Sequence, residues 1–378
     1  MKHYFLGMAA NYRSEEWSKH TFTAGSTQDY RDLEKCLFEK YKGETMLCKN
    51  GRSALTLALK AYFDPGDMVL VNGFTCYAVY EAVITAGLIP VFVDISKDDL
   101  NFDLDALERS IIENNADEQK FTIKGIIVQN TLGNPVDIKA IERFTKKHNL
   151  IIIEDLAHCA GIRYKDGREV GTIGTATVLS FGKEKSIDTI SGGAVVFRKP
   201  KKYNIKAPNK APKPSDHLRA RFYPTFGALC RGLSYIRLGG ALMRVLVKIH
   251  WVERSADNKL DLKRLPSKFE AKLALEQIKH FRRNGEPQLR DFCFVKDRDT
   301  VLDELQKAGY FFAGLWYEKP VSPERYYKKV HFPEKKCPNA VWVAEHILNL
   351  PNYYTGRDLA PARRIIKKYI TEGKNGEN

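Results

Sequence analysis

Apolar residues along the chain alternate between helical and extended spacing from about residue 35 onward. Helical spacing predicts helices over 53–63, 77–86 and 138–148. The run 150–153 is almost wholly β-branched, which is typical of a strand buried on both faces. Helices and strands that alternate in this way indicate an α/β fold, with a mostly parallel sheet between two layers of helices. The strands are expected at 68–71, 89–93, 125–129, 150–153, 177–181 and 193–198.

Residues 205–258 form a basic segment that the alternating pattern does not explain. They carry ten Lys or Arg and three Asp or Glu, which is about half of the net charge of +15. The segment opens on a linker rich in Pro and Lys. Over 226–250 it continues with small and apolar residues that basic residues interrupt. On a helical wheel Arg237, Arg244 and Lys248 fall in one narrow band, which predicts an amphipathic helix with a basic stripe.

The length of 378 residues predicts one large domain and a smaller one. A helix over 265–281 and a mixed α+β tail follow the basic segment, so we place the boundary near Asn258. The expected units are a large domain over 1–258, which includes the basic segment as a partly helical insertion or connector, and a small α+β domain over 259–378. A composition of 43% hydrophobic and 28% charged residues excludes a disordered or collagen-like chain.

The cysteines and the N-terminus indicate the compartment. The seven cysteines are scattered and form no CxxC pair, so neither a disulfide framework nor a zinc site is predicted. The first 17 residues hold too short an apolar run for a signal peptide, and no apolar stretch reaches the roughly 18 residues of a spanning helix. We therefore expect a cytoplasmic protein without a metal site. The net charge favours anionic ligands or surfaces.

Three separate segments carry candidate chemistry, and the first is Asn50-Gly51-Arg52-Ser53. Here a glycine turn leads directly into a predicted helix. The N–H groups at a helix N-terminus, together with a Ser hydroxyl, can bind a phosphate. A helix cap formed by Asn50 or Ser53, with no ligand, explains the same residues.

The second segment, 151–158, ends a buried strand with Glu154 and Asp155 and continues to His158. Ligands of open α/β sheets bind at the carboxyl ends of the strands. A carboxylate at this edge can hold the positive charge of a ring nitrogen, which is what a pyridinium cofactor requires. A helix cap by Asp155 and an ordinary hydrogen-bonded core position for His158 form the alternative.

The third segment runs from Ser180 to Lys185 and precedes the pair Gly192-Gly193. A lysine in a partly desolvated cleft has a lowered pKa, so that its free amine can form a Schiff base and later carry protons. Most lysines are solvated surface charges, so this segment alone leaves the assignment open.

In this order, the three segments resemble the DegT/StrS family of sugar-nucleotide aminotransferases, pyridoxal-phosphate enzymes of the aspartate-aminotransferase fold (fold type I). The small-Gly-Thr-Ala turn of that family falls on 50–53, its Glu-Asp-x-Ala-Gln/His signature on 154–158 and its Ser-Phe-x-x-x-Lys on 180–185. The resemblance runs from about residue 45 to 200 and again from about 265 to the end.

The resemblance implies a role for each matching position. Lys185 would be the Schiff-base lysine, because the reactive lysine of the family lies five residues after the Ser. Asp155 would pair with the pyridine nitrogen, and His158 would contact the ring hydroxyl of the cofactor. The phosphate of pyridoxal phosphate would lie against Gly51, Arg52, Ser53 and Ser180.

The chain departs from the family pattern at two places. Where the family has an aromatic residue stacked on the cofactor, this chain has Cys76 and then Tyr77, so Tyr77 is the residue that could stack. The Asn that the neighbouring subunit contributes to the phosphate aligns with 261–265, which contain no Asn. Lys263 or Arg264 could substitute for it electrostatically.

The resemblance implies a homodimeric aminotransferase that moves an amino group from an amino acid such as glutamate to a nucleotide-linked keto sugar, for cell-surface polysaccharide or a related glycan. Lys185 argues against the dehydratases of the family, which have His at that position. The alternative is a protein that keeps the fold, has lost the chemistry and acts in binding or regulation. The sequence holds no signature of specific nucleic-acid binding. For the helix over 226–250, peripheral contact with the inner face of an anionic membrane and packing within the protein or across a dimer both stay open.

Overall fold

The computed structural model describes residues 4–6, 20–116, 122–234, 236, 238–252, 258–279, 290–312, 315–351 and 360–371. Seven strands form its central sheet, in the order β2-β9-β8-β7-β6-β3-β5. In this sheet β9 is antiparallel to both of its neighbours, and the other neighbouring pairs are parallel. The strands are β2 (Glu44–Cys48), β3 (Met68–Asn72), β5 (Ile89–Val93), β6 (Ile123–Val128), β7 (Ile151–Asp155), β8 (Ala176–Ser180) and β9 (Gly193–Phe197).

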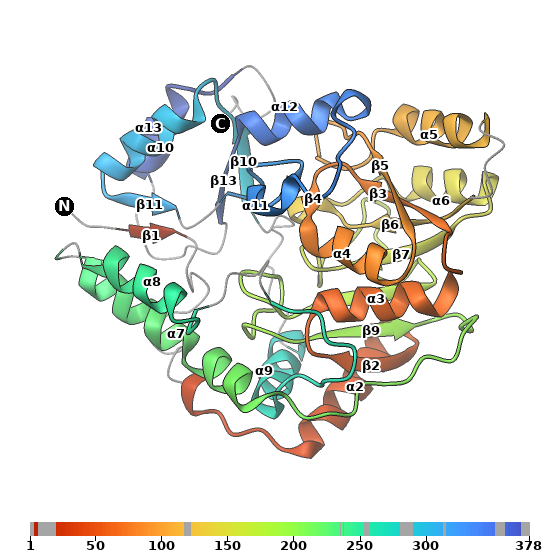
Figure 1. The fold of residues 1–378 in the computed structure, drawn as a ribbon, viewed down its shortest axis with the longest axis horizontal. Coiled ribbons are helices and arrows are strands. Elements are labelled where there is room, and N and C mark those ends of the chain that lie inside the picture. The colour runs from red at the N-terminus through yellow and green to blue at the C-terminus, as the bar shows by residue number, and fades with distance from the viewer. Residues whose placement is uncertain are drawn as a thin grey trace.

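Both faces of this sheet are buried, which is why its strands consist of nearly continuous apolar runs. Val69 and Val71 of β3 belong to one core cluster, and Leu70 between them belongs to the other. Alternate side chains of a strand point to opposite faces, so a layer of helices covers each one. One layer has α3 (Gly51–Tyr62), α4 (Tyr77–Thr85) and α12 (Pro338–His346); the other has α2 (Thr27–Tyr41), α5 (Leu104–Ala116), α6 (Ile138–Lys147) and α9 (Lys268–Lys279). Figure 1 shows this arrangement, which confirms the expected α/β fold.

The C-terminal part builds a smaller core of its own. It packs two helices on an antiparallel strand pair, with Val301, Leu348 and Ile366 among the buried contacts. Two further pairs join distant parts of the chain, because β1 pairs with β11 and β4 with β12. The elements here are β10 (Arg290–Phe294), α10 (Arg298–Lys307), β11 (Tyr310–Phe312), β12 (Val321–Ser322), α11 (Glu324–Tyr327), η3 (Glu334–Lys336), β13 (Ile347–Pro351) and α13 (Ala360–Lys367), with β1 (Tyr4–Leu6), β4 (Thr75–Cys76) and η1 (Thr131–Gly133) elsewhere in the chain.

The basic segment folds as two helices, which corrects the single helix expected over 226–250. The helices α7 (Pro214–Ser234) and α8 (Gly239–Lys248) lie side by side at one edge of the molecule (Figure 1). Gly239 and Gly240 fall in the middle of the expected helix, and glycine is a poor helix former. The chain turns just before them and starts the second helix there.

The break also changes the expected basic stripe. Arg237 lies outside the described residues, whereas Arg244 and Lys248 both lie on α8. Across the described part of the chain, no helix combines the length and the apolar character needed to cross a bilayer. The helix expected over 265–281 is α9, and it packs against α2. The domain boundary near Asn258 stays a prediction.

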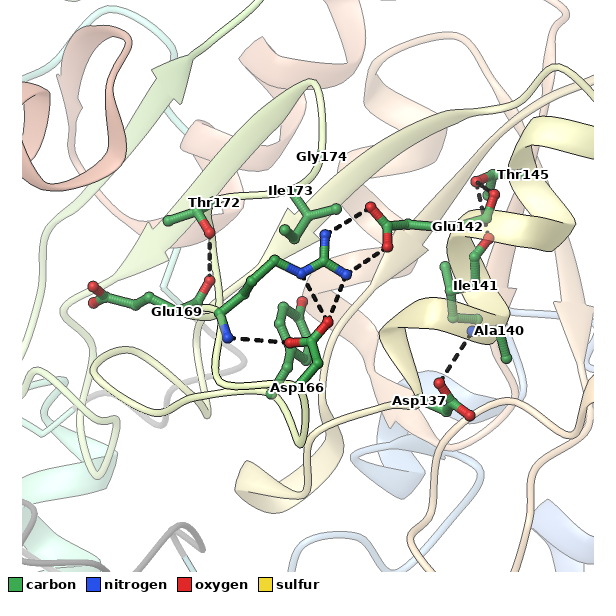
Figure 2. A network of polar contacts seen from close by, with 12 residues as sticks. Asp137, Ala140, Ile141, Glu142, Thr145, Asp166, Glu169, Thr172, Ile173 and Gly174 are labelled. Carbon is green, nitrogen blue, oxygen red and sulfur yellow. Dashed lines mark hydrogen bonds and ion pairs between the residues drawn. The ribbon is translucent and has the colours of Figure 1, made fainter.

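The connection from β7 to β8 is fastened to α6 by a polar network (Figure 2). Arg168 donates to both carboxylate oxygens of Glu142 on α6, at 2.9 and 2.6 Å, and its Nε donates to Asp166 at 2.8 Å. Each group is partly exposed, so each pair alone contributes little to stability. The two-pronged geometry nevertheless fixes where this connection lies. It therefore supports the segment that leaves the end of β7.

Candidate active site

A cavity opens at the carboxyl edge of the parallel strands. Asp155 ends β7, Ser180 ends β8 and Gln129 directly follows β6, and all three line the cavity. Open α/β sheets bind their ligands at this edge. The cavity brings together six of the eight predicted site residues: Gly51, Arg52, Asp155, His158, Ser180 and Lys185.

Lys185, which is partly buried, holds its amine in this cavity among other side chains. The amine nitrogen lies 3.0 Å from Nε2 of His158 and 4.4 Å from the centroid of the Trp316 ring. Burial lowers the pKa of Lys185 from its usual 10.5, and the nearby carboxylate of Asp155 acts in the opposite direction. A lowered pKa enlarges the fraction of free amine at neutral pH. Lys185 is thus placed as a nucleophilic lysine must be.

His158 has an orientation that complements this amine. The backbone N–H of Leu132 donates to its Nδ1 at 3.2 Å, so the proton of the neutral ring belongs on Nε2. Nε2 faces the amine of Lys185 and, 3.3 Å away, the hydroxyl of Tyr317. The ring also stacks on Trp316, with centroids 5.0 Å apart. A neutral His158 can therefore donate to an uncharged Lys185, which agrees with the lowered pKa.

The two carboxylates at the end of β7 have different surroundings, and Asp155 is the one in the cavity. Its Oδ1 accepts the backbone N–H of Ala157 at 3.0 Å. Burial raises the pKa of Asp155, whereas the N–H of Ala157 and the charge of Lys185 counteract this rise. A buried carboxylate of this kind gains from a cationic partner, so a protonated ring nitrogen suits the position.

Glu154 is fully buried and does not line the cavity. It pairs with Arg198 at 3.0 Å. Its two oxygens also accept one hydroxyl and three backbone N–H groups at 2.6 to 2.9 Å, from Tyr164, Gly171, Ile173 and Gly174. Neighbouring carboxylates therefore do two different jobs, since Glu154 holds the connection to β8 in place and Asp155 faces the ligand site.

The turn at Asn50 both caps α3 and opens onto the cavity. The Asn50 side chain accepts the N–H of Ser53 at 2.8 Å, while Gly51 and Arg52 line the cavity. A Cβ on Gly51 would lie 2.6 Å from the Cβ of Ser180, so only glycine permits this close approach. The Ser180 hydroxyl thus lies beside a helix N-terminus, where the dipole favours a phosphate. The Arg52 guanidinium is paired with Glu81.

Two predicted residues lie away from the cavity wall. Ser53 is fully buried, and its hydroxyl accepts the N–H of Asp261 at 3.1 Å. Tyr77 begins α4 and stacks its ring on Tyr326, with centroids 4.4 Å apart and 14° between the planes. The expected stacking position of Tyr77 is therefore not on the cavity wall. Tyr317 is an aromatic residue that does line it, next to His158.

One wall of the cavity comes from the basic segment, which sequence reasoning did not find. Lys49 pairs with Asp216 on α7 at 2.9 Å, and the amine of Lys183 lies 4.3 Å from the centroid of the Tyr223 ring. The sequence predicts a helix that begins only at 226, whereas α7 begins at Pro214, so the residues of its first turns were not expected to be helical. Its lining residues have the spacing of a single helix face and are Asp216, Arg219, Ala220 and Tyr223.

An asparagine that the aligned window 261–265 lacks lies on the cavity wall three residues earlier. Asn258 accepts from the side-chain amide of Asn50 at 3.2 Å and donates to the hydroxyl of Ser191 at 3.4 Å. It therefore touches the turn that precedes α3. Lys263 and Arg264, which are expected to act from the neighbouring subunit, do not line the cavity of their own chain, so their role stays a prediction.

Arg290 of β10 connects the C-terminal part to the residue before Lys185. It is buried, donates to Glu184 at 2.5 Å and to Asn349 of β13 at 3.0 Å, and its guanidinium lies 4.1 Å from the centroid of the Trp316 ring. Glu184 has a positive φ of 60°, a conformation that residues with a Cβ rarely adopt. The contact with Arg290 therefore helps to hold an unfavourable backbone beside the amine of Lys185.

Comparison with known proteins gives one family for this chain. The model of the DegT/DnrJ/EryC1/StrS aminotransferase family matches residues 15–207. A pleiotropic regulatory protein of Geobacillus stearothermophilus is 35% identical over 151 residues, which are 40% of this chain and 38% of that protein. A UDP-4-amino-4,6-dideoxy-N-acetyl-beta-L-altrosamine transaminase of Campylobacter jejuni is 35% identical over 176 residues, 46% and 44% of the two chains. The matches thus span about two fifths of these relatives.

The fold extends over nearly the whole chain. The crystal structure of a DegT DnrJ EryC1 StrS aminotransferase from Brucella abortus has a TM-score of 0.62 to this structure, at 22% sequence identity. It covers 95% of this chain and 93% of that chain. At this identity the likeness shows the fold, and it confirms the expected fold type.

Proposed function

The chain belongs to the DegT/DnrJ/EryC1/StrS family of pyridoxal-phosphate-dependent aminotransferases, and on this premise we propose that it transfers an amino group from an amino acid to a keto sugar. The observation that carries the proposal is the position of Lys185. Its amine belongs to a partly buried side chain, is hydrogen-bonded to His158 and shares a cavity with Asp155. A lysine and an acidic residue in this relation are what a pyridine aldehyde cofactor needs.

The residues of the cavity fit pyridoxal phosphate. The turn at Gly51 and the hydroxyl of Ser180 suit its phosphate, because a Cβ at Gly51 would fill the space between them. Asp155 suits its ring nitrogen, and the amine of Lys185 suits its aldehyde carbon. When bound, the cofactor supplies a ring that accepts electrons and carries the amino group between the two substrates.

Three side chains of this protein would then move and hold protons. The uncharged Nζ of Lys185 would take the proton from the α-carbon of the amino-acid donor and pass it to a carbon of the bound cofactor. In the second half of the reaction it would run the same transfer in reverse, from that carbon to the carbon of the keto sugar. Nε2 of His158 orients this nitrogen through its hydrogen bond. The carboxylate of Asp155 would keep the ring nitrogen protonated, because a negative charge next to this nitrogen favours its charged form.

The charges of the wall support an anionic acceptor substrate. Arg219 comes from α7 and Lys183 from the turn after β8, and both line the cavity. Cationic groups of this kind favour the phosphates of a nucleotide-linked keto sugar. The Campylobacter jejuni relative is named as the transaminase of a UDP-linked amino sugar. Glutamate as the donor and a homodimer with shared active sites complete the proposal.

The test uses two neighbouring lysines. Borohydride reduction of the protein with pyridoxal phosphate should trap the cofactor on the peptide of Lys185, as mass spectrometry reads it. Lys185→Ala should abolish the adduct and the visible absorption of the protein, and Lys183→Ala should keep both. A wild-type protein that forms no adduct refutes the proposal. A wild-type protein that forms the adduct but does not convert the cofactor to its amine form with glutamate is a binding or regulatory protein instead.

A further inference from the structure

Exposed apolar side chains gather on the two helices of the basic segment. Of the 13 large apolar residues exposed in the described part of the chain, six lie between 229 and 251. The exposed fractions are 62% at Ile236, 52% at Val245 and 53% at Ile249. Isolated apolar residues are normal on a surface, whereas a cluster of them marks a contact site. The six are Leu229, Ile236, Leu238, Val245, Ile249 and Trp251.

The helix α8 presents one outward face and one inward face. Leu238, Arg244, Val245, Lys248 and Ile249 are all exposed and have the spacing of a single helix face, which we call the outer face. The residues of the opposite face are partly or fully buried in a core with α7 and α9; they are Leu242, Met243, Leu246 and Val247. The hairpin is therefore already packed on its inner side, and its fold does not require the apolar residues of the outer face.

The charge around the outer face has a single sign. Residues 217–252 contain six Lys or Arg and no Asp or Glu. Arg244 and Lys248 lie one turn apart on α8, beside Val245 and Ile249. Apolar residues that enter a lipid interface, flanked by cations that attract its headgroups, are the composition of a helix that lies on an anionic membrane. We propose that the outer face docks on an anionic lipid surface.

The same observations disfavour two other occupants. A second copy that met this face symmetrically would oppose Arg244 and Lys248 to the same cations, with no acid among residues 217–252 to pair them. A nucleic acid would satisfy the cations through its phosphates but would leave Val245 and Ile249 against a polar backbone. A lipid surface provides both the anionic groups and the apolar layer.

Docking in this way has a consequence for the cavity. The helix α7 that packs against α8 also forms a wall of the cavity through Arg219 and Tyr223. A protein held by the outer face would therefore keep its cavity one helix away from the lipid headgroups. The proposal concerns binding alone, so its test does not depend on the proposed transamination.

The experiment is flotation of the full-length protein with vesicles of phosphatidylcholine, either pure or with about one third phosphatidylglycerol, at low and high salt. The protein should float with the anionic vesicles at low salt and remain unbound with the pure ones. Arg244→Gln with Lys248→Gln should weaken binding roughly fivefold for each cation, or about 25-fold for the pair. Val245→Ser with Ile249→Ser should weaken it on the order of 10-fold.

Two matched controls carry the same changes elsewhere on the surface. Lys328→Gln with Lys335→Gln removes two exposed cations, and Leu104→Ser with Ile112→Ser removes two exposed apolar side chains of α5. Both control proteins should bind as the parent does.

Several results overturn the proposal. One is that the wild-type protein does not float with anionic vesicles at low salt. Another is that all four double variants float equally well. A third is that the protein binds an RNA oligonucleotide but no vesicle. A fourth is that the Val245→Ser, Ile249→Ser variant has a different molecular mass from the parent in light scattering, while its flotation is unaffected. The last two results assign the outer face to nucleic acid and to a second copy, respectively.

Discussion

The variants Glu154→Gln and Asp155→Asn test whether Glu154 stabilises the fold while Asp155 serves the proposed reaction. In the first variant an amide replaces a carboxylate that faces three backbone N–H groups and a guanidinium. The amide nitrogen cannot accept these hydrogen bonds, and it brings two donors of its own. The side chain of Arg198, only 10% exposed, then loses its carboxylate partner in the protein interior and keeps hydrogen bonds to neutral groups, such as the carbonyl of Gly174.

The magnitude follows from that pair. Removal of one member of a buried ion pair costs about 3 to 5 kcal/mol, because the other charge stays buried without compensation. We expect Glu154→Gln to lower the free energy of unfolding by this amount, which corresponds to a drop in melting temperature on the order of 10 °C.

Asp155→Asn should behave in the opposite way. Burial raises the pKa of Asp155 above its unfolded value, so the folded state holds the proton more tightly and ionisation at neutral pH costs stability. The neutral amide removes this cost, and the variant should be at least as stable as the parent at pH 7. Its half-reaction with glutamate should nevertheless slow on the order of 100-fold, because the partner of the ring nitrogen is lost.

Urea unfolding at pH 7, followed by circular dichroism, gives the stabilities, and single-turnover absorbance gives the half-reaction rates. Glu154→Gln should lower the urea midpoint, whereas Asp155→Asn should slow the half-reaction without lowering the urea midpoint. An unchanged urea midpoint for Glu154→Gln, or equal destabilisation of both variants, refutes the division of labour between the carboxylates.

Three further results follow from the site. Burial lowers the pKa of Lys185 and the charge of Asp155 raises it, so Asp155→Asn should lower this pKa further. The pH at which borohydride traps half of Lys185 on pyridoxal phosphate should therefore fall, and a shift to higher pH contradicts the proximity of the two side chains. Asn258→Asp should weaken the affinity for pyridoxal phosphate by about tenfold, through a carboxylate beside the phosphate site, whereas Lys328→Gln, at an exposed residue that does not line the cavity, should not change it, as fluorescence titration can measure. Tyr77→Leu should leave this affinity unchanged, since its ring stacks outside the cavity; a large loss would return Tyr77 to the cofactor.

Periodicity predicts six of the seven strands of the central sheet, because burial on both faces leaves long apolar runs, but it does not predict β2 at the edge of the sheet. The strand expected over 89–93 is β5 itself, and the helix expected over 138–148 differs from α6 by one residue at its end. In such elements local sequence and tertiary burial favour the same conformation.

The basic segment could not be predicted in the same way. A helical wheel assumes a continuous helix, and it says nothing of the break before Gly239. Residues 206–215 are rich in Pro and Lys, a composition that predicts a linker, although Pro214 is well tolerated in the first turn of α7. The wall that α7 contributes to the cavity was missed for this reason.

Site residues were predictable where a strand end or a local motif carried them. Asp155 and Lys185 lie in such segments, and Gln129 could have been found by the same reasoning, since it follows a buried strand. Arg290 and Trp316 have no such signal, because only the folding of the C-terminal part brings them within reach of Lys185.

Arg290 of the C-terminal part is hydrogen-bonded to Glu184, the residue before Lys185. The position of the Lys185 amine therefore depends on the C-terminal part as well as on the central sheet. A truncated protein that ends near Asn258 would retain Asp155, His158 and Lys185 but would lack the side chain that holds the backbone next to the amine. Small displacements of β10 relative to the central sheet would shift that backbone and with it the nitrogen. A change that loosens the C-terminal part would therefore displace the amine of Lys185 even before a substrate binds.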